Sequence, residues 1–261
     1  MKTSRFRMPA RSSGVLFFRV MPRADRARRA PAIDPARRVR FGRLLRAWYR
    51  RSARDLPWRR TRDPYHILVS ELMLQQTQVA RVMEKYSEFL HKFPTLAAVS
   101  VARPRQVREA WNGLGYYARA ANLHRLAREL VPAEGQARQL PADPEALRQL
   151  PGIGRYTAGA IASFAFQERA ALVDTNVARV LRRVFAPALA RRGSGTERIV
   201  WDIAERVLPR TRRATYVHNQ ALMELGALVC TARVAHCGRC PVRSVCGTAA
   251  TGWRHEGTRI S

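Results

Sequence analysis

The sequence predicts an all-α fold on two observations. From Asp34 onward, apolar residues recur at helical spacing in segments joined by short turns, and few segments show the period-two alternation typical of strands. The 261 residues are enough for one large domain or two small ones with a sizeable core. No apolar run approaches the roughly 18 residues needed to span a bilayer, so a membrane protein is excluded.

The first helix is expected to begin at Asp34-Pro35, which supplies an N-cap and a first turn. Residues 56–59 then interrupt the pattern as a loop. The strongest periodic stretch covers residues 68–93 and ends at Pro94. Further helices are predicted over residues 104–112, 116–131, 143–149, 155–167, 175–185, 196–208 and 214–229.

The net charge of +29 indicates a partner rich in phosphate. Of the 48 basic residues, all but Lys2, Lys85 and Lys92 are arginine, whose fixed fork of donors suits phosphate oxygens. A GC-rich genome would also favour arginine codons, but it does not explain the small number of acids. Residues 1–33 lack helical periodicity and are expected to form a disordered basic arm.

Two Gly-x-Gly turns separate predicted helices, one at residues 113–115 and one at residues 152–154. The second leads directly into a helix through Arg155, so unpaired backbone N–H groups and the positive end of the helix dipole would form an anion site there. Without side chains, Gly152 and Gly154 would let a DNA phosphate approach the backbone. The alternative is an ordinary helix–helix turn.

All four cysteines lie near the C-terminal end, at Cys230, Cys237, Cys240 and Cys246. A disulfide framework would not be confined to one end of a chain of this size. Four thiolates at this spacing suit one metal centre. Zinc sites usually show two Cys-x2-Cys pairs and this chain has one, so the spacing favours an iron–sulfur cluster and leaves zinc open.

Glu71 is the most informative acid, because its helical neighbours Ile67, Leu68 and Leu74 are apolar. Gln75, at +4, is the one polar partner expected on that side. A carboxyl held there would be desolvated and its pKa raised, as suits a general acid. The alternative is that Glu71 borders the apolar face and forms an ion pair with an arginine.

Asp174 is the second candidate acid. It follows the apolar residues 170–173 and precedes the helix predicted over residues 175–185. Its position alone favours a helix N-cap. The functional alternative is a carboxylate fixed near a cleft, where it would face a developing positive charge.

Together, several separated motifs resemble the helix–hairpin–helix DNA glycosylases that carry a 4Fe–4S cluster, and among them the MutY-type adenine DNA glycosylases. The resemblance extends over residues 54–246. The motifs occur in the family's order: Pro57-Trp58-Arg59, residues 70–79, residues 111–120, residues 150–158, residues 173–177 and the cysteine spacing.

The resemblance implies two lobes with DNA in the groove between them. A six-helix barrel would occupy residues 60–167 and end in the hairpin, and a cluster domain would combine residues 34–59 and 168–250. Because only 15 residues follow Cys246, no MutT-like domain is expected. The resemblance further implies a monovalent cation at the hairpin, a monomer bound to mismatched double-stranded DNA, and a cytoplasmic location at the nucleoid.

The family also implies a role for each matching residue. Glu71 would protonate adenine, and Asp174 would stabilise the oxocarbenium-like sugar, with Asn176 beside it. The further roles are base contact by Arg59 and Glu224, filling of the base stack by Gln75 and Gln76, a wedge near the opposite base by Tyr116, and DNA binding by Gly152, Gly154 and Arg155.

Tyr156 stands where the related endonuclease III enzymes place a Schiff-base lysine. A phenol cannot form a Schiff base, so a monofunctional enzyme is expected, one that removes the base without efficient strand cleavage.

The chain departs from the MutY pattern at Thr175, where most members have glycine, and in the expected absence of the MutT-like domain. The thymine and uracil mismatch glycosylases of the same superfamily lack that domain and are the enzymatic alternative, although residues 75–78 favour adenine. A cluster-bearing DNA-binding protein without catalysis is the alternative from another class. The presence of both Glu71 and Asp174 argues against it.

Overall fold

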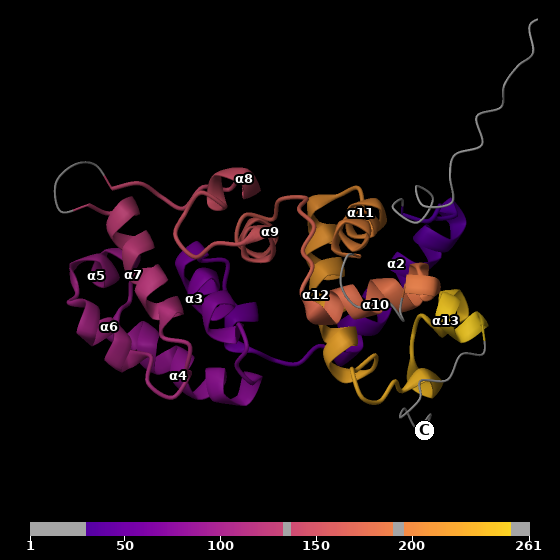
Figure 1. Ribbon diagram of the computed structural model, residues 1–261, viewed down its shortest axis with the longest axis horizontal. Coiled ribbons are helices and arrows are strands. Elements are labelled where there is room, and N and C mark those ends of the chain that lie inside the picture. The colour runs from indigo at the N-terminus through magenta and orange to yellow at the C-terminus, as the bar shows by residue number, and fades with distance from the viewer. Residues whose placement is uncertain (1–29, 133–136, 190–195, 252–261) are drawn as a thin grey trace, which may run out of the picture.

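The computed structural model describes residues 30–132, 137–189 and 196–251. Within these ranges the chain is helical and its only β pairing is an isolated bridge between Cys230 and Ala235, so the all-α prediction is confirmed. The helices form two lobes (Figure 1). In the described residues, no helix has the length and hydropathy that a membrane crossing requires.

Residues 1–29 of the expected disordered arm lie outside the described residues. The last four residues of that arm differ from the prediction, because Ala30 and Ile33 pack partly buried against the core. The ordered chain therefore begins before the Asp34 N-cap.

The first described helix, α2 (Pro35–Ser52), begins as the sequence predicts. The Asp34 carboxylate accepts a hydrogen bond of 2.7 Å from the backbone N–H of Arg37 and so caps the helix. Phe41 and Leu45 are fully buried where α2 packs against α12 (Arg212–Leu228).

One lobe contains the helices from α3 to α9, and α3 lies at its centre in contact with α4, α7 and α9. Its helices are α3 (Pro64–Leu74), α4 (Val79–Lys92), α5 (Leu96–Val101), α6 (Pro104–Ala110), α7 (Ala118–Leu130), α8 (Pro144–Leu147) and α9 (Arg155–Phe164). The short α8, the turn after it and α9 form a helix–hairpin–helix.

The other lobe joins α2 to the C-terminal part of the chain, and α12 packs against both α2 and α10. Its remaining elements are α10 (Thr175–Phe185), η2 (Pro187–Leu189), α11 (Glu197–Val207), η3 (Cys237–Arg239), η4 (Arg243–Val245) and α13 (Gly247–Ala250). A 3-10 turn, η1 (Pro57–Arg59), lies between the lobes in the segment expected as a loop.

The periodic stretch over residues 68–93 is two helices, with a break after Leu74. Gln75 leaves the helix with ψ 114°, and Gln76 adopts a left-handed φ of 55°. Periodicity missed the break because both helices bury apolar residues in one core. For the same geometric reason α7 begins two residues later than expected, since Tyr116 has a φ of 46°. The six-residue α5 was not predicted.

Candidate active site

A cavity of about 800 Å³ lies between the lobes, at the ends of α3, α9, α10 and α12. Most of the site residues expected from the sequence line it, although they come from segments far apart in the chain. They are Arg59, Glu71, Gln75, Gln76, Gly152, Gly154, Arg155, Tyr156, Asp174, Asn176 and Glu224. Tyr116 and the four cysteines are not among the lining residues.

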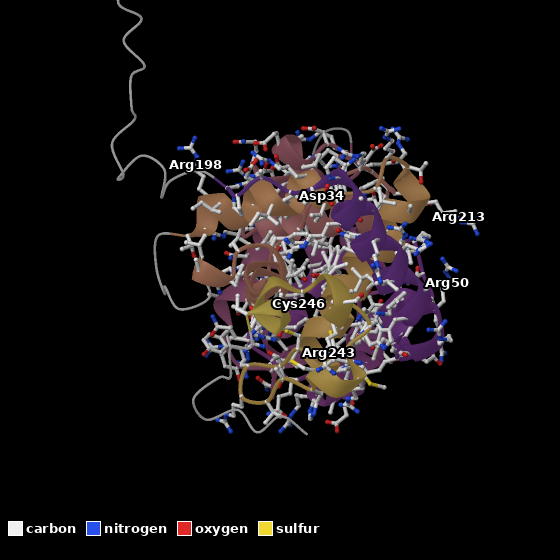
Figure 2. All side chains as sticks on the ribbon, turned by 90° about the vertical axis from the view of Figure 1, so that its right-hand side faces the viewer. Asp34, Arg50, Arg198, Arg213, Arg243 and Cys246 are labelled. Carbon is white, nitrogen blue, oxygen red and sulfur yellow. The ribbon has the colours of Figure 1, made fainter. Side chains whose placement is uncertain are left out.

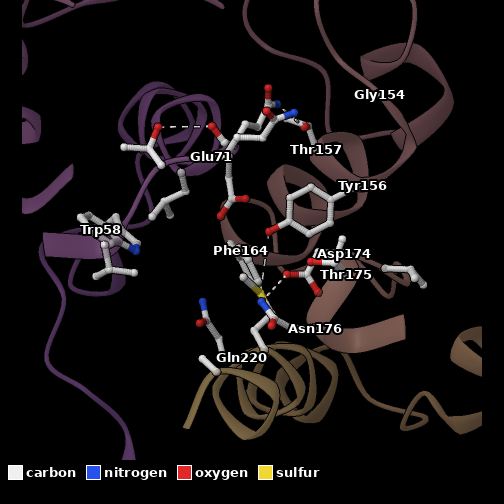
Figure 3. A pocket seen from close by; sticks show the side chains of 18 of the residues that line it. Trp58, Glu71, Gly154, Tyr156, Thr157, Phe164, Asp174, Thr175, Asn176 and Gln220 are labelled. Carbon is white, nitrogen blue, oxygen red and sulfur yellow. Dashed lines mark hydrogen bonds between the residues drawn. The ribbon is translucent and has the colours of Figure 1, made fainter. Parts of the chain in front are cut away.

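Glu71 lies on the last turn of α3 with its side chain directed into the cavity (Figure 3). The residue is 3 % exposed, and its Oε2 has no hydrogen-bond partner among the described residues. Burial raises the pKa of Glu71 to about 7, and the negative charge of Asp174 adds to this, while a hydrogen bond from Tyr156 and the positive charge of Arg59 oppose it. Glu71 can therefore hold a proton near neutral pH.

The prediction that Gln75 is the polar partner of Glu71 is wrong. Because α3 ends at Leu74, Gln75 is no longer one helical turn from Glu71, and its side-chain amide donates instead to Thr157 Oγ1 at 3.3 Å. The group that meets Glu71 is the Tyr156 hydroxyl. The prediction assumed that the helix continues through Gln75, and it does not.

Asp174 performs the structural role expected of it and also lines the cavity. Its Oδ1 accepts a hydrogen bond of 2.7 Å from the Val177 N–H, which caps α10, and its Oδ2 accepts one of 3.1 Å from Asn176 Nδ2. Arg179 Nη2 donates to Asn176 Oδ1 at 2.7 Å, and its Nε donates to the carbonyl of Cys230. The carboxylate is therefore fixed in orientation.

Tyr156, in the first turn of α9, stands between the two acids (Figure 3). Its hydroxyl, which is hydrogen-bonded to Glu71, also lies 3.9 Å from Met223 Sδ. Burial and the charges of Glu71 and Asp174 raise the pKa of Tyr156 well above its usual value, so the phenol stays neutral. Two acids of different character and one neutral hydroxyl thus meet in one cavity.

Glu224 is fully buried and bound by two arginines. Arg54 donates to it from its backbone N–H, Nε and Nη2, each at 2.9 Å, and Arg59 donates from Nη2 at 2.8 Å. Burial alone would raise the pKa of Glu224, but these hydrogen bonds outweigh it and hold the pKa at about 2. Glu224 therefore orients Arg59, and base contact by either residue stays a prediction.

Several lining residues were not singled out from the sequence, and three of them lie next to predicted site residues. Arg54 follows α2 in a segment without a motif. Gln220, one helical turn before Glu224, accepts a hydrogen bond of 3.0 Å from Arg59 Nε, and Met223 meets Tyr156. The helical spacing from Glu224 was the one signal that could have found Gln220.

The hairpin turn has the geometry that favours glycine. Gly152 has a φ of 79°, and a Cβ added there would lie 2.6 Å from the Asn122 Cβ, whereas a Cβ on Gly154 would meet nothing within 4 Å. Arg155 packs its guanidinium 3.8 Å from the centre of the Trp201 ring and pairs with Glu205 at 3.0 Å. DNA binding by this turn, and the expected cation there, remain predictions.

The four cysteines lie in the segment that follows α12, in the lobe that contains α2 and α10. Figure 2 views the end of that lobe and labels Cys246 and Arg243. Among the described residues, no three His, Cys, Asp or Glu side chains are grouped as a metal site. Burial raises the pKa of Cys240 to about 12, and the charges of the other three cysteines add to the shift. Arg183 Nη1 donates to Cys230 Sγ at 3.3 Å. All four thiols are free and half-buried, and cysteine thiolate is the ligand type that iron–sulfur clusters require.

The hairpin beside a cavity with two acids defines a class of DNA repair proteins. The HhH-GPD superfamily of base excision DNA repair proteins matches residues 69–206, more than half of the chain. Among solved structures, a thermostable thymine-DNA glycosylase aligns with 83 % of this chain and 98 % of its own at 29 % identity and a TM-score of 0.73. A trapped endonuclease III–DNA covalent intermediate has the same fold, with a TM-score of 0.70 at 21 % identity, over 85 % of this chain and all of that one.

Curated relatives narrow the class. The chain is 43 % identical to the adenine DNA glycosylase of Mycobacterium tuberculosis, over 87 % of this chain and 71 % of that protein. It is 44 % identical to the adenine DNA glycosylase of Rattus norvegicus, over 79 % of this chain and 41 % of that protein. The chain belongs to the adenine DNA glycosylase family. It spans about two fifths of the length of its mammalian relatives.

Proposed function

We propose that this chain is a monofunctional DNA glycosylase that hydrolyses the N-glycosidic bond of adenine mispaired with 8-oxoguanine or guanine. The observation that carries the proposal is the pair of acids in the cavity between the lobes. One is a buried carboxyl with a pKa of about 7 and an unpartnered oxygen, and the other is a fixed carboxylate. The names of the curated relatives support adenine as the base.

The reaction divides between Glu71 and Asp174. Glu71, protonated, donates its proton to a ring nitrogen of the extruded adenine, so the glycosidic electron pair leaves with the base. Asp174, as an anion, stabilises the positive charge that develops on the sugar. Water then adds to the anomeric carbon and loses a proton, which restores Glu71. Because Tyr156 offers no amine, no Schiff base forms and the strand stays intact.

We further propose that Cys230, Cys237, Cys240 and Cys246 hold a 4Fe–4S cluster. The cluster would bind these thiols as thiolates and hold together the loops of residues 230–246, which carry Arg233, Arg239 and Arg243. Purified protein should be brown, with iron and acid-labile sulfide in equal amounts. A colourless protein containing zinc would contradict the assignment.

The test of the function is base release under single-turnover conditions from duplexes that pair A with 8-oxoguanine, A with G, T with G, and U with G. Release of adenine alone supports the proposal. Release of thymine or uracil as the main product would support the second candidate, a mismatch glycosylase, which the thymine-DNA glycosylase structure favours. The matched control is Glu71→Gln, which should bind mismatched duplex but release base roughly 10²- to 10⁴-fold more slowly.

Mismatched double-stranded DNA would bind across the cavity mouth, where the hairpin and the arginines of both lobes lie. We propose that the protein acts there as a monomer. Sedimentation of the protein with and without an equimolar mismatched duplex tests this, and a 2:1 complex at saturation would contradict it.

A further inference from the structure

Arg119, on the first turn of α7, is a buried cation without a carboxylate partner among the described residues. It is 6 % exposed, and burial lowers the pKa of its guanidinium. A buried charge is costly unless hydrogen bonds satisfy it. The acceptors that satisfy Arg119 are therefore informative.

One side of the guanidinium binds the end of α3. Nη1 donates to the carbonyl oxygens of Leu72 at 2.9 Å and Met73 at 2.8 Å, and also to that of Gln75. Carbonyls at a helix C-terminus have no partner within the helix and carry the negative end of its dipole. Arg119 thus fixes the point where the chain turns from α3 toward Gln76.

The other side binds the turn before α7. Nη2 donates to the carbonyl oxygens of Leu114 and Gly115, each at 2.9 Å, and Nε donates to that of Tyr116 at 3.4 Å. Thr77 adds a second link, because its hydroxyl accepts from Nη2 at 3.1 Å and lies 3.3 Å from a carbonyl oxygen of each loop, Gln75 and Leu114, between which its one proton is shared. Arg119 and Thr77 together join residues 75–77 to residues 114–116.

Each joined loop carries a non-glycine residue in the left-handed region, Gln76 with φ 55° and Tyr116 with φ 46°. Tyr116 is 62 % exposed, and Gln76 is also exposed. Such backbone conformations persist only where the surroundings hold them. The seven hydrogen bonds of Arg119 provide that restraint for both residues at once.

We infer that Arg119 is a positioning residue that couples the two loops, so that Gln76 and Tyr116 enter mismatched DNA as one rigid unit. The inference rests on the proposed function, because it assigns these two side chains to the DNA. A lysine at this position would keep the charge but lose the fork that reaches both loops. A residue that only stabilised the fold would leave the coupling between the loops unchanged.

The test is a double-mutant cycle on DNA affinity. Gln76→Ala and Tyr116→Ala are made singly and together in a Glu71→Gln background, which blocks base release, and affinity is measured for duplexes with and without an A opposite 8-oxoguanine. In the parent, which is the Glu71→Gln protein with Arg119 intact, the affinity loss of the double variant should be smaller than the product of the two single losses. The difference should be roughly 3- to 30-fold, as expected for residues in one network. When Arg119→Lys is also present, the affinity loss of the double variant should equal the product of the two single losses, so that no coupling remains.

Two further variants separate positioning from stability. Thr77→Val removes the hydroxyl link, and with it one of the seven hydrogen bonds of Arg119, but keeps the buried cation itself. It should also reduce the coupling, even if Arg119→Lys fails to fold. Leu126→Val, a core change two turns along α7, should lower the melting temperature yet keep the coupling. The inference would be overturned if the affinity losses of Gln76→Ala and Tyr116→Ala simply multiplied in the parent. It would also be overturned if neither Thr77→Val nor Arg119→Lys changed the coupling. A parent that binds both duplexes equally would instead overturn the proposed function.

Discussion

Two glutamates of the same cavity reach opposite charge states through their surroundings. Glu71 and Glu224 are both buried, but only Glu224 receives charged donors, from Arg54 and Arg59. Desolvation therefore decides the pKa of Glu71, at about 7, and hydrogen bonding decides that of Glu224, at about 2. A proton donor and a permanent anion thus coexist within one site.

The rate of base release should depend on the protonation of Glu71. Because the acid form is the reactive one, the single-turnover rate should fall tenfold per pH unit above about pH 7. Glu71→Gln should lower the rate by roughly 10²- to 10⁴-fold. A rate that stays constant between pH 6 and about pH 9 would show that another group is the acid.

The same shift predicts how Glu71 affects stability. A carboxyl whose pKa is raised by folding, here from 4.5 to about 7, makes the folded state less stable as pH rises through that range. The free energy of unfolding, measured with urea at a series of pH values, should therefore fall less between pH 4.5 and 7 in Glu71→Gln than in the unchanged protein. Equal losses would mean that Glu71 is ionised in the folded protein at pH 5.

Tyr156→Lys should add strand cleavage to base removal. The new amine would lie where the phenol now stands, between Glu71 and Asp174, and could attack the sugar carbon to form a Schiff base. Borohydride trapping of a covalent protein–DNA complex measures the gain. Efficient cleavage by the unchanged protein would contradict the monofunctional assignment.

At the scale of elements, helix ends rather than helix faces build the site. Glu71 lies near the C-terminus of α3, Tyr156 near the N-terminus of α9, and Asp174 caps α10. Backbone groups at helix ends lack partners within the helix, so these ends bind anions or the side chains of capping residues, and the chain can turn sharply there. The hairpin between α8 and α9 offers the clearest test of this.

Gly152→Ala and Gly154→Ala should have different effects. The first forces a side chain into a left-handed φ and against Asn122, and should cost about 1–3 kcal/mol of stability and distort the turn. The second meets no protein atom, so the melting temperature should not change, but the methyl group would keep a phosphate away. DNA affinity should fall in both. Unchanged affinity in Gly154→Ala would exclude this turn from the DNA contact.

At the scale of the whole molecule, the charge of +29 divides unevenly. Residues 1–60 hold 19 of the 48 basic residues and only three acids, Asp25, Asp34 and Asp55. A minority of the exposed arginines in the described residues are paired with carboxylates, as in Arg105–Glu109 and Arg206–Asp202. Residues 1–29 alone add nine basic residues and one acid to the charge available to phosphate.

Removal of residues 1–29 should weaken binding to any duplex at low salt and reduce the slope of log affinity against log salt concentration. The single-turnover rate of base release at saturating protein should not change, because the truncated chain keeps Glu71 and Asp174, the two acids of the proposed reaction. A truncated protein that binds normally but no longer releases base would contradict this division.

The sequence by itself determined the helical class and the caps at Asp34 and Asp174, which follow from local periodicity and residue type. Its resemblance to a known family indicated most of the site residues that line the cavity. Only the tertiary structure decided where α3 ends, that Tyr156 rather than Gln75 meets Glu71, and that Glu224 is saturated by Arg54 and Arg59. Each of these depends on groups distant in sequence that packing brings within hydrogen-bonding distance. Periodicity along one segment carries no information about them.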